Sequence, residues 1–157
     1  MRANKVVVST DSPDDQLDSF FDKYEPTIAA LARACRGAMR KRMPTANELV
    51  YDNYQFLAIG YSPTERTSEC IVSLAINKHG VALSFYYGAT LDDPDGVLLG
   101  TGKQNRFIRL PTSSTLTEPA VESRIDAAIR QGAVPLTIGE NGKLMIKSIS
   151  AKQVPRR

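Results

Sequence analysis

The chain has few of the residues on which most enzyme active sites depend. It contains one histidine, His79, and two cysteines, Cys35 and Cys70, that form no CxxC pair. A Ser–His–Asp or Cys–His arrangement would have to use His79, which is expected at a hairpin tip and is poorly placed for exact positioning. The cysteines are expected to be buried free thiols in a reducing compartment. The sequence contains no complete catalytic set and favours a protein without catalytic activity.

Long hydrophobic runs and a strong net charge are also missing. The longest apolar run near the start is Val6–Val8, far shorter than a signal-peptide core or a membrane span. We therefore expect a cytoplasmic protein with no membrane partner. A formal net charge of +3 in 157 residues is too small to imply nucleic acid by itself. A hydrophobic content of 42% suits one soluble globular domain.

Two consecutive helices are predicted near the start of the chain. Ser12 can cap the first helix and Pro13 suits its first position, and apolar residues then recur at helical spacing. Pro26 should end this helix and begin a second one, which Pro44 should stop at about Arg42. The apolar stripe of the first helix comprises Leu17, Phe20, Phe21 and Tyr24.

Strand signals dominate the middle of the chain, and a final helix and hairpin are predicted after it. The final helix should stop near Gly132. Beyond it, Asn141-Gly142 between alternating apolar segments predicts a hairpin. The strand-like segments are Leu49–Tyr61, Glu69–Asn77, Val81–Tyr87 and Arg106–Leu110.

Several separated signatures occur in the order found in one known family. They are Tyr24-Glu25-Pro26, Pro44 through Glu48 with Tyr51 and Tyr54, Gly60-Tyr61-Ser62-Pro63, Gly88-Ala89-x-Leu91-x-Asp93-Pro94, and Leu99-Gly100-x-Gly102-Lys103-x-x-Arg106-x-Ile108-x-Leu110. In these residues the chain resembles the YdhG-like domain family, a bacterial domain family of unknown function, over roughly residues 15–132. The resemblance implies a compact α+β fold with an antiparallel sheet packed on helices. Some relatives are described as frataxin-like and linked to iron delivery.

The predicted elements and the resemblance together indicate one α+β domain. About five antiparallel strands are expected to pack against the N-terminal helices and a C-terminal helix. The YdhG-like domain should span residues 12–132, and residues 133–157 should form a β-hairpin extension and a basic tail outside the match.

Acidic residues provide a candidate iron site. Hard cations bind several convergent oxygen ligands, and the frataxin-like comparison would need a negative ridge on the first helix. The acidic turn after the third strand fails the EF-hand spacing. A solvated helix face and turn-forming aspartates explain the same residues without a metal. The metal candidates are Asp15, Asp18, Asp22, Asp92 and Asp93.

A glycine turn and a group of tyrosines provide a second candidate, for a small anionic molecule. Backbone N–H groups in a glycine turn can form an anion-binding concavity, to which nearby cations add charge. Neither the P-loop nor the dinucleotide fingerprint is complete, because Val97 and Asn105 occupy positions that need glycine. A tight turn before a strand and core aromatics are the structural alternatives. The ligand candidates are Tyr51, Tyr54, Tyr86, Gly100, Gly102, Lys103 and Arg106.

Basic residues on the second helix provide a third candidate, for an acidic protein partner. Arg33, Arg36 and Arg40 share one face of this helix, although a solvated face explains them equally. No nucleic-acid motif accompanies them. We therefore expect a non-catalytic binding or accessory module for a small, anionic ligand. The alternatives are a frataxin-like intracellular iron-binding protein and an interaction module that uses the basic helix face.

Overall fold

Three α-helices and one six-stranded sheet form the part of the chain that the computed structural model describes, residues 11–157. The α+β class is confirmed, with six strands where about five were predicted. The helices are α1 (Pro13–Phe21), α2 (Pro26–Arg42) and α3 (Pro119–Gln131). The strands are β1 (Asn47–Asp52), β2 (Leu57–Ser62), β3 (Val72–Asn77), β4 (Gly80–Phe85), β5 (Arg106–Arg109) and β6 (Leu144–Ile149). Short 3₁₀ turns occur at η1 (Thr67–Glu69), η2 (Gly88–Thr90) and η3 (Ser113–Thr117).

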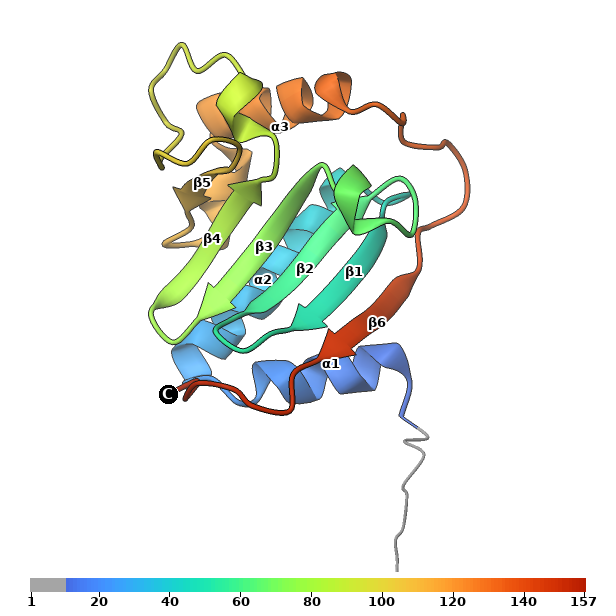
Figure 1. Cartoon of the computed structure of the whole chain (residues 1–157), viewed down its shortest axis with the longest axis vertical. Helices are drawn as coiled ribbons and strands as arrows, with labels where there is room; N and C mark the ends of the chain where they lie inside the picture. Colours follow the sequence, from blue (N-terminus) through green and yellow to red (C-terminus); the bar gives the residue numbers. More distant parts are fainter. Residues whose placement is uncertain (1–10) are drawn as a thin grey trace, which may run out of the picture.

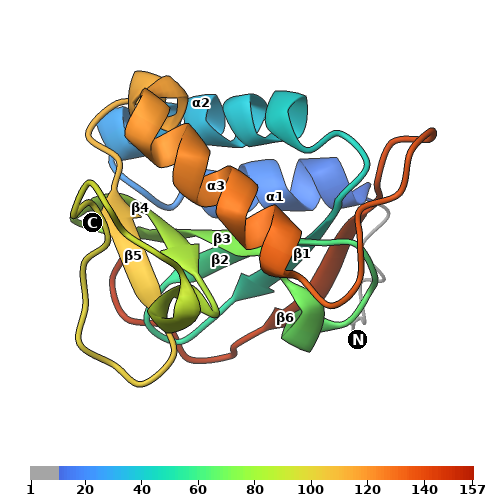
Figure 2. The ribbon, with the colours of Figure 1, turned by 90° about the horizontal axis from the view of Figure 1, so that it is seen from above.

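The helices form one layer and the sheet forms the other. Figure 1 looks onto the sheet with α2 behind it, and Figure 2 shows all three helices on the same side of the sheet. In residues 11–157 no α-helix covers the opposite side, which we call the open face; only the short η1 turn lies over part of it. The described helices include none that is long and apolar enough to cross a membrane. The Val6–Val8 run lies outside the described residues.

The first two helices begin at the predicted prolines, but α1 ends at Phe21, so Tyr24 lies in the turn before Pro26 and not on the helix. The Ser12 side chain accepts a hydrogen bond from the Asp15 main-chain N–H, and Pro13 is the first helical residue. Pro26 is the first residue of α2, which ends at Arg42 as expected. The apolar stripe of α1 is buried in a core that also contains the inward-facing residues of the sheet.

The sheet order is β5-β4-β3-β2-β1-β6. Strands β1 to β5 pair with their neighbours in antiparallel fashion, and Gly80, with a φ of +147°, closes the predicted β3–β4 hairpin. β6 pairs in parallel with β1, so the sheet is mixed. β5 and β6 are the two edge strands, and α3 connects them by passing over the helix-covered face of the sheet.

The predicted C-terminal hairpin is wrong. Residues 134–143 form no strand, and β6 pairs with β1. A two-residue type I′ turn needs positive φ at both central residues, and neither Asn141 nor Gly142 has it. Gly142 instead allows a close chain approach, because an added Cβ would lie 1.9 Å from the Ala46 carbonyl oxygen. Residues 133–157 thus supply an edge strand of the same sheet.

Candidate functional site

Small side chains occupy the centre of the open face. Residues alternate between the two faces of a strand, so each residue paired across the register shares a face with its partner. Two neighbouring rows of three residues run across β2, β3 and β4 on the face away from the helices. We call them the small-residue platform, which comprises Gly60, Ser73 and Ser84 in one row and Ala58, Ala75 and Ala82 in the next.

Aromatic side chains border the platform. A hollow of about 280 Å³ lies over it, and Tyr51, Phe56 and Tyr86 contribute to its walls. The Phe56 and Tyr86 side chains are 36% and 39% exposed, so large apolar surfaces meet solvent here. A second hollow shares Ala75 and extends over β5. The platform therefore forms part of the lining of both hollows.

Arg109 provides positive charge at the β5 side of the platform. It pairs in register with Ala82, and its guanidinium lies 5.3 Å from the centre of the Phe107 ring. Within residues 11–157 it has no carboxylate partner. Its charge is consequently available to a bound anion.

Cys70 borders the platform from beneath the η1 loop. A Cβ added at Gly60 would lie 2.6 Å from the Cys70 sulfur, so glycine is required for this packing. Burial raises the pKa of the Cys70 thiol to about 11. The thiol therefore stays protonated near neutral pH and is a weak nucleophile.

The predicted tyrosines separate into two groups. Tyr51 and Tyr86 line the same hollow, although 35 positions separate them in the chain. The Tyr51 hydroxyl also makes a hydrogen bond to Thr67 in η1. Tyr54 lies in the β1–β2 turn, where its main-chain oxygen accepts a hydrogen bond from the C-terminal tail, and it does not line the hollow.

The predicted glycine turn is closed by its own side chain. The Arg106 guanidinium donates hydrogen bonds to the main-chain oxygens of Gly102 and Asn105. Gly100 has a φ of +112° and packs beside the Phe107 ring. Lys103 is exposed, and none of the four predicted turn residues lines the hollow over the platform. The loop reaches the platform elsewhere, through a 2.7 Å hydrogen bond from Ser84 to Asn105.

The predicted acidic ridge and the predicted basic face largely pair with each other. Arg33 on α2 lies 2.8 Å from carboxylate oxygens of both Asp18 and Asp22 on α1. These bonds, to Asp22 first and then Asp18, raise the pKa of the Arg33 guanidinium. Arg36 similarly reaches Asp14, while Asp15 contributes its main-chain N–H to the Ser12 cap.

The other metal candidates hold the loop after β4 in place. The Asp93 carboxylate accepts hydrogen bonds of 2.9 Å from the main-chain N–H groups of Val97 and Leu98. The Asp92 main-chain oxygen accepts a bond from Arg124. Across residues 11–157, no three His, Cys, Asp or Glu side chains are grouped to hold a metal ion. This arrangement gives the iron alternative no support.

A buried carboxylate that the sequence analysis missed lies between α2 and the sheet. Glu48 is 0% exposed and accepts three hydrogen bonds from Arg36, one of 2.7 Å from Arg40 and one of 2.9 Å from the Tyr61 hydroxyl. Burial and the Glu48 charge raise the Tyr61 pKa well above its usual value. Burial lowers the Arg36 pKa, but the bonds to Glu48 outweigh it and the pKa is raised overall. Two residues of the predicted basic face, Arg36 and Arg40, thus point inward to the Glu48 carboxylate.

A second buried carboxylate ties the C-terminal tail to the sheet. Asp52 is 1% exposed and contacts Lys23 at 2.6 Å and Arg156 at 2.9 Å. Arg156 is itself 5% exposed. Asp52 interrupts the apolar residues of the predicted segment Leu49–Tyr61, which is a sequence signal, whereas Glu48 lies one residue before that segment.

Comparison of the chain with protein-family models, curated proteins and solved structures finds no match. The resemblance to the YdhG-like family therefore stays a prediction, and so do the functions that it implies.

Proposed function

We propose that this protein is a non-catalytic binding module that holds a small planar molecule with an anionic group on the small-residue platform. The observation that carries the proposal is the composition of the open face. The solvated face of an antiparallel sheet usually carries polar side chains. Here its central six positions are glycine, alanine and serine, bordered by aromatic rings.

The shape of the site favours a planar ligand. Small side chains leave a shallow, wide floor, and Tyr51, Phe56 and Tyr86 rise around it. Aromatic rings make offset-stacked and edge-to-face contacts with other ring systems. The Ser73 hydroxyl has no side-chain hydrogen-bond partner within the described chain and can bind a polar ring atom.

The charge around the site favours an anionic group on the ligand. Arg109 borders the platform without a carboxylate partner among residues 11–157. Arginine binds carboxylate, sulfonate and phosphate groups through several N–H donors at once. The raised Cys70 pKa favours simple binding over covalent chemistry, because the thiol is protonated near neutral pH.

The experiment uses 8-anilinonaphthalene-1-sulfonate, a ring system with one negative charge, as the probe. We expect the folded protein to bind one probe molecule with a rise in fluorescence. Ala75→Leu should abolish this binding because the longer side chain fills the floor of the hollow. Ala30→Leu, on the exposed side of α2, is the matched control and should bind normally.

A second pair of variants tests the charge. Arg109→Gln should weaken binding of the probe by roughly tenfold, because it removes one charge-assisted contact of about 1.4 kcal/mol. Arg130→Gln, an exposed arginine on α3, should have no effect. The uncharged analogue N-phenyl-1-naphthylamine should bind both arginine variants equally. Probe binding that survives Ala75→Leu would disprove the proposal.

A further inference from the structure

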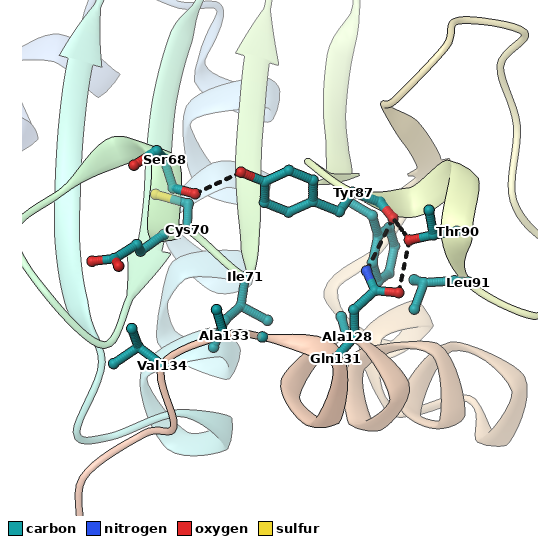
Figure 3. A pocket seen from close by; sticks show the side chains of 13 residues that line it. Ser68, Cys70, Ile71, Tyr87, Thr90, Leu91, Ala128, Gln131, Ala133 and Val134 are labelled. Atoms are coloured by element: carbon teal, nitrogen blue, oxygen red, sulfur yellow. Dashed lines mark hydrogen bonds between the residues drawn. The ribbon is translucent and has the colours of Figure 1, made fainter.

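A separate cavity lies between the η1 loop, the η2 turn and the C-terminal end of α3. Figure 3 shows its lining, with the Tyr87 ring extending across it. Its volume of about 320 Å³ lies at the lower end of the range of small-molecule sites. We call it the Tyr87 pocket. Ile71 and Phe85, which are 5% and 0% exposed, supply apolar lining.

Hydrogen bonds between three elements hold the walls of the Tyr87 pocket. The Tyr87 hydroxyl donates to the Ser68 main-chain oxygen at 2.8 Å. The Tyr87 main-chain oxygen accepts bonds from Gln131 at 3.1 Å and from Thr90 at 2.9 Å. These bonds connect η1, η2 and α3, so the pocket exists before a ligand arrives and requires little reorganisation.

The charge of the lining is negative. Glu69 is the one charged residue among the described residues that line the pocket. One Glu69 oxygen accepts a 2.6 Å bond from the Thr64 hydroxyl. Arg66, the nearest cation, lies 3.9 Å away and its side chain is 76% exposed, so it neutralises this carboxylate only weakly.

The end of α3 adds to this negative potential. Gln131 and Gly132 line the pocket, and the C-terminal end of a helix carries a partial negative charge. The Gly132 N–H donates to the carbonyls of Ala128 and Ile129. The last two helical carbonyls, of Arg130 and Gln131, have no backbone donor within residues 11–157. Arg130, in the last turn of α3, is exposed and does not line the pocket, so the lining itself favours a cation over an anion.

We propose that the Tyr87 pocket binds a primary alkylammonium group, with the alkyl chain against Ile71 and Phe85 and the ammonium near Glu69 and the end of α3. Apolar lining next to a single carboxylate suits a short chain with a positive head. The lining offers no lysine, arginine or histidine to an anionic ligand among the described residues. This site shares Cys70 with the hollow over the platform but differs from it in charge, since the available charge at the platform is positive.

The test compares three probes with the same chain: hexylammonium, hexan-1-ol and hexanoate, at pH 7.5. Binding is followed by amide shifts in NMR spectra of the ¹⁵N-labelled protein. Hexylammonium should shift the amides of residues 68–71, 87–91 and 128–134 and should bind roughly tenfold more tightly than hexan-1-ol. Hexanoate should not bind. Equal affinities for the alcohol and the ammonium would overturn the proposal.

Three variants separate the contributions. Glu69→Gln keeps an acceptor for Thr64 and should reduce hexylammonium affinity to that of hexan-1-ol, which itself should not change. Ala133→Leu, at an exposed lining position, should weaken binding of both hexylammonium and hexan-1-ol. Ala30→Leu is the control and should not affect binding of either probe. Ala75→Leu should leave hexylammonium binding intact whatever its effect on the naphthalene probe. Hexylammonium binding that is insensitive to Glu69→Gln would also overturn the proposal.

Discussion

On its helix-covered face the sheet carries two fully buried carboxylates, both on β1, whereas the centre of its open face consists of glycine, alanine and serine. Glu48 and Asp52 are 0% and 1% exposed, yet each is ionically paired. The usual distribution is the reverse, with charge on the solvated face and apolar residues inside. The helix-covered face therefore contains buried ion pairs, whereas small side chains form the centre of the open face.

The buried charges connect segments that are distant in sequence. Glu48 ties β1 to α2, and Asp52 ties it to Lys23 after α1 and to Arg156 near the last residue. The platform connects no segments in this way. The proposed binding function concerns the open face alone, so the two faces can be tested separately.

The largest effect is expected when the Glu48 carboxylate is removed. Glu48→Ala should lower the free energy of unfolding by about 3–5 kcal/mol, because it leaves Arg40 and the buried Tyr61 hydroxyl without their acceptor and Arg36 with Asp14 alone. Urea denaturation monitored by circular dichroism measures the change. Glu140→Ala, at an exposed position, is the control and should match the parent. Glu48→Gln should be milder, since it retains an acceptor.

The next largest loss of stability is expected when the ion pair between Asp52 and Arg156 in the C-terminal tail is removed. Arg156→Ala should cost about 2 kcal/mol of unfolding free energy, less than Glu48→Ala because Lys23 still pairs with Asp52. Arg157→Ala removes a neighbouring but 53% exposed guanidinium and should change little. Equal urea midpoints for the two variants would show that the buried pair does not hold the tail.

Alkaline pH should weaken the fold through one thiol on each side of the sheet. Burial raises the pKa of Cys35, on α2, and of Cys70, beside the platform, from 9.0 to about 11. The unfolded chain loses these protons first, so stability is complete below about pH 9 and falls as the pH rises towards 11. At pH 10 the loss should be on the order of 1 kcal/mol for each thiol.

Denaturation curves at pH 8 and pH 10 measure this decline. The Cys35→Ala/Cys70→Ala variant should show a decline smaller by roughly 2 kcal/mol, even if it is less stable at pH 8. An identical decline in the variant and the parent would assign the alkaline effect to other groups. Tyr24, whose pKa burial raises to about 12, adds to the loss at higher pH.

Local signals in the sequence were sufficient for much of the fold. Pro13 and Pro26 begin helices because their fixed φ suits the first turn, and the Gly80 hairpin follows from one positive φ. Alternation at Leu144 and Ile146 indicates the strand β6 itself, but its parallel pairing with β1 spans almost a hundred residues and leaves no local pattern. The Asn141-Gly142 signal pointed to a hairpin that this pairing prevents.

The candidate site was predictable only in part. Tyr51 and Tyr86 were chosen as aromatic residues with hydroxyl groups, and they do meet at one hollow. The platform itself has no sequence signature, since alanine, glycine and serine form rows only when the register of three strands is known. The pairing of α1 acids with α2 arginines likewise depends on how the two helices pack.

The exposed ion pairs between α1 and α2 should contribute less than the buried ones. Arg33→Gln removes contacts to Asp18 and Asp22, whose side chains are 63% and 69% exposed, and should cost about 0.5 kcal/mol. Salt should reduce this difference, and at about 1 M NaCl it should be nearly absent. A cost as large as that of Arg156→Ala would remove the distinction between exposed and buried pairs.

A similarly small effect on stability, and the most direct test of the open face, is expected from charges of opposite sign at Ser73. Ser73→Glu and Ser73→Lys introduce long side chains at the same platform position, and each should change the unfolding free energy by only about 0.5 kcal/mol, because the position faces solvent. Their effects on the naphthalene sulfonate probe should differ. The glutamate repels the sulfonate, whereas the lysine can extend its ammonium towards it, so Ser73→Glu should bind the probe at least roughly tenfold more weakly than Ser73→Lys. Equal affinities in a fluorescence titration would mean that the open face does not select ligands by charge, and the role assigned to Arg109 would then be wrong.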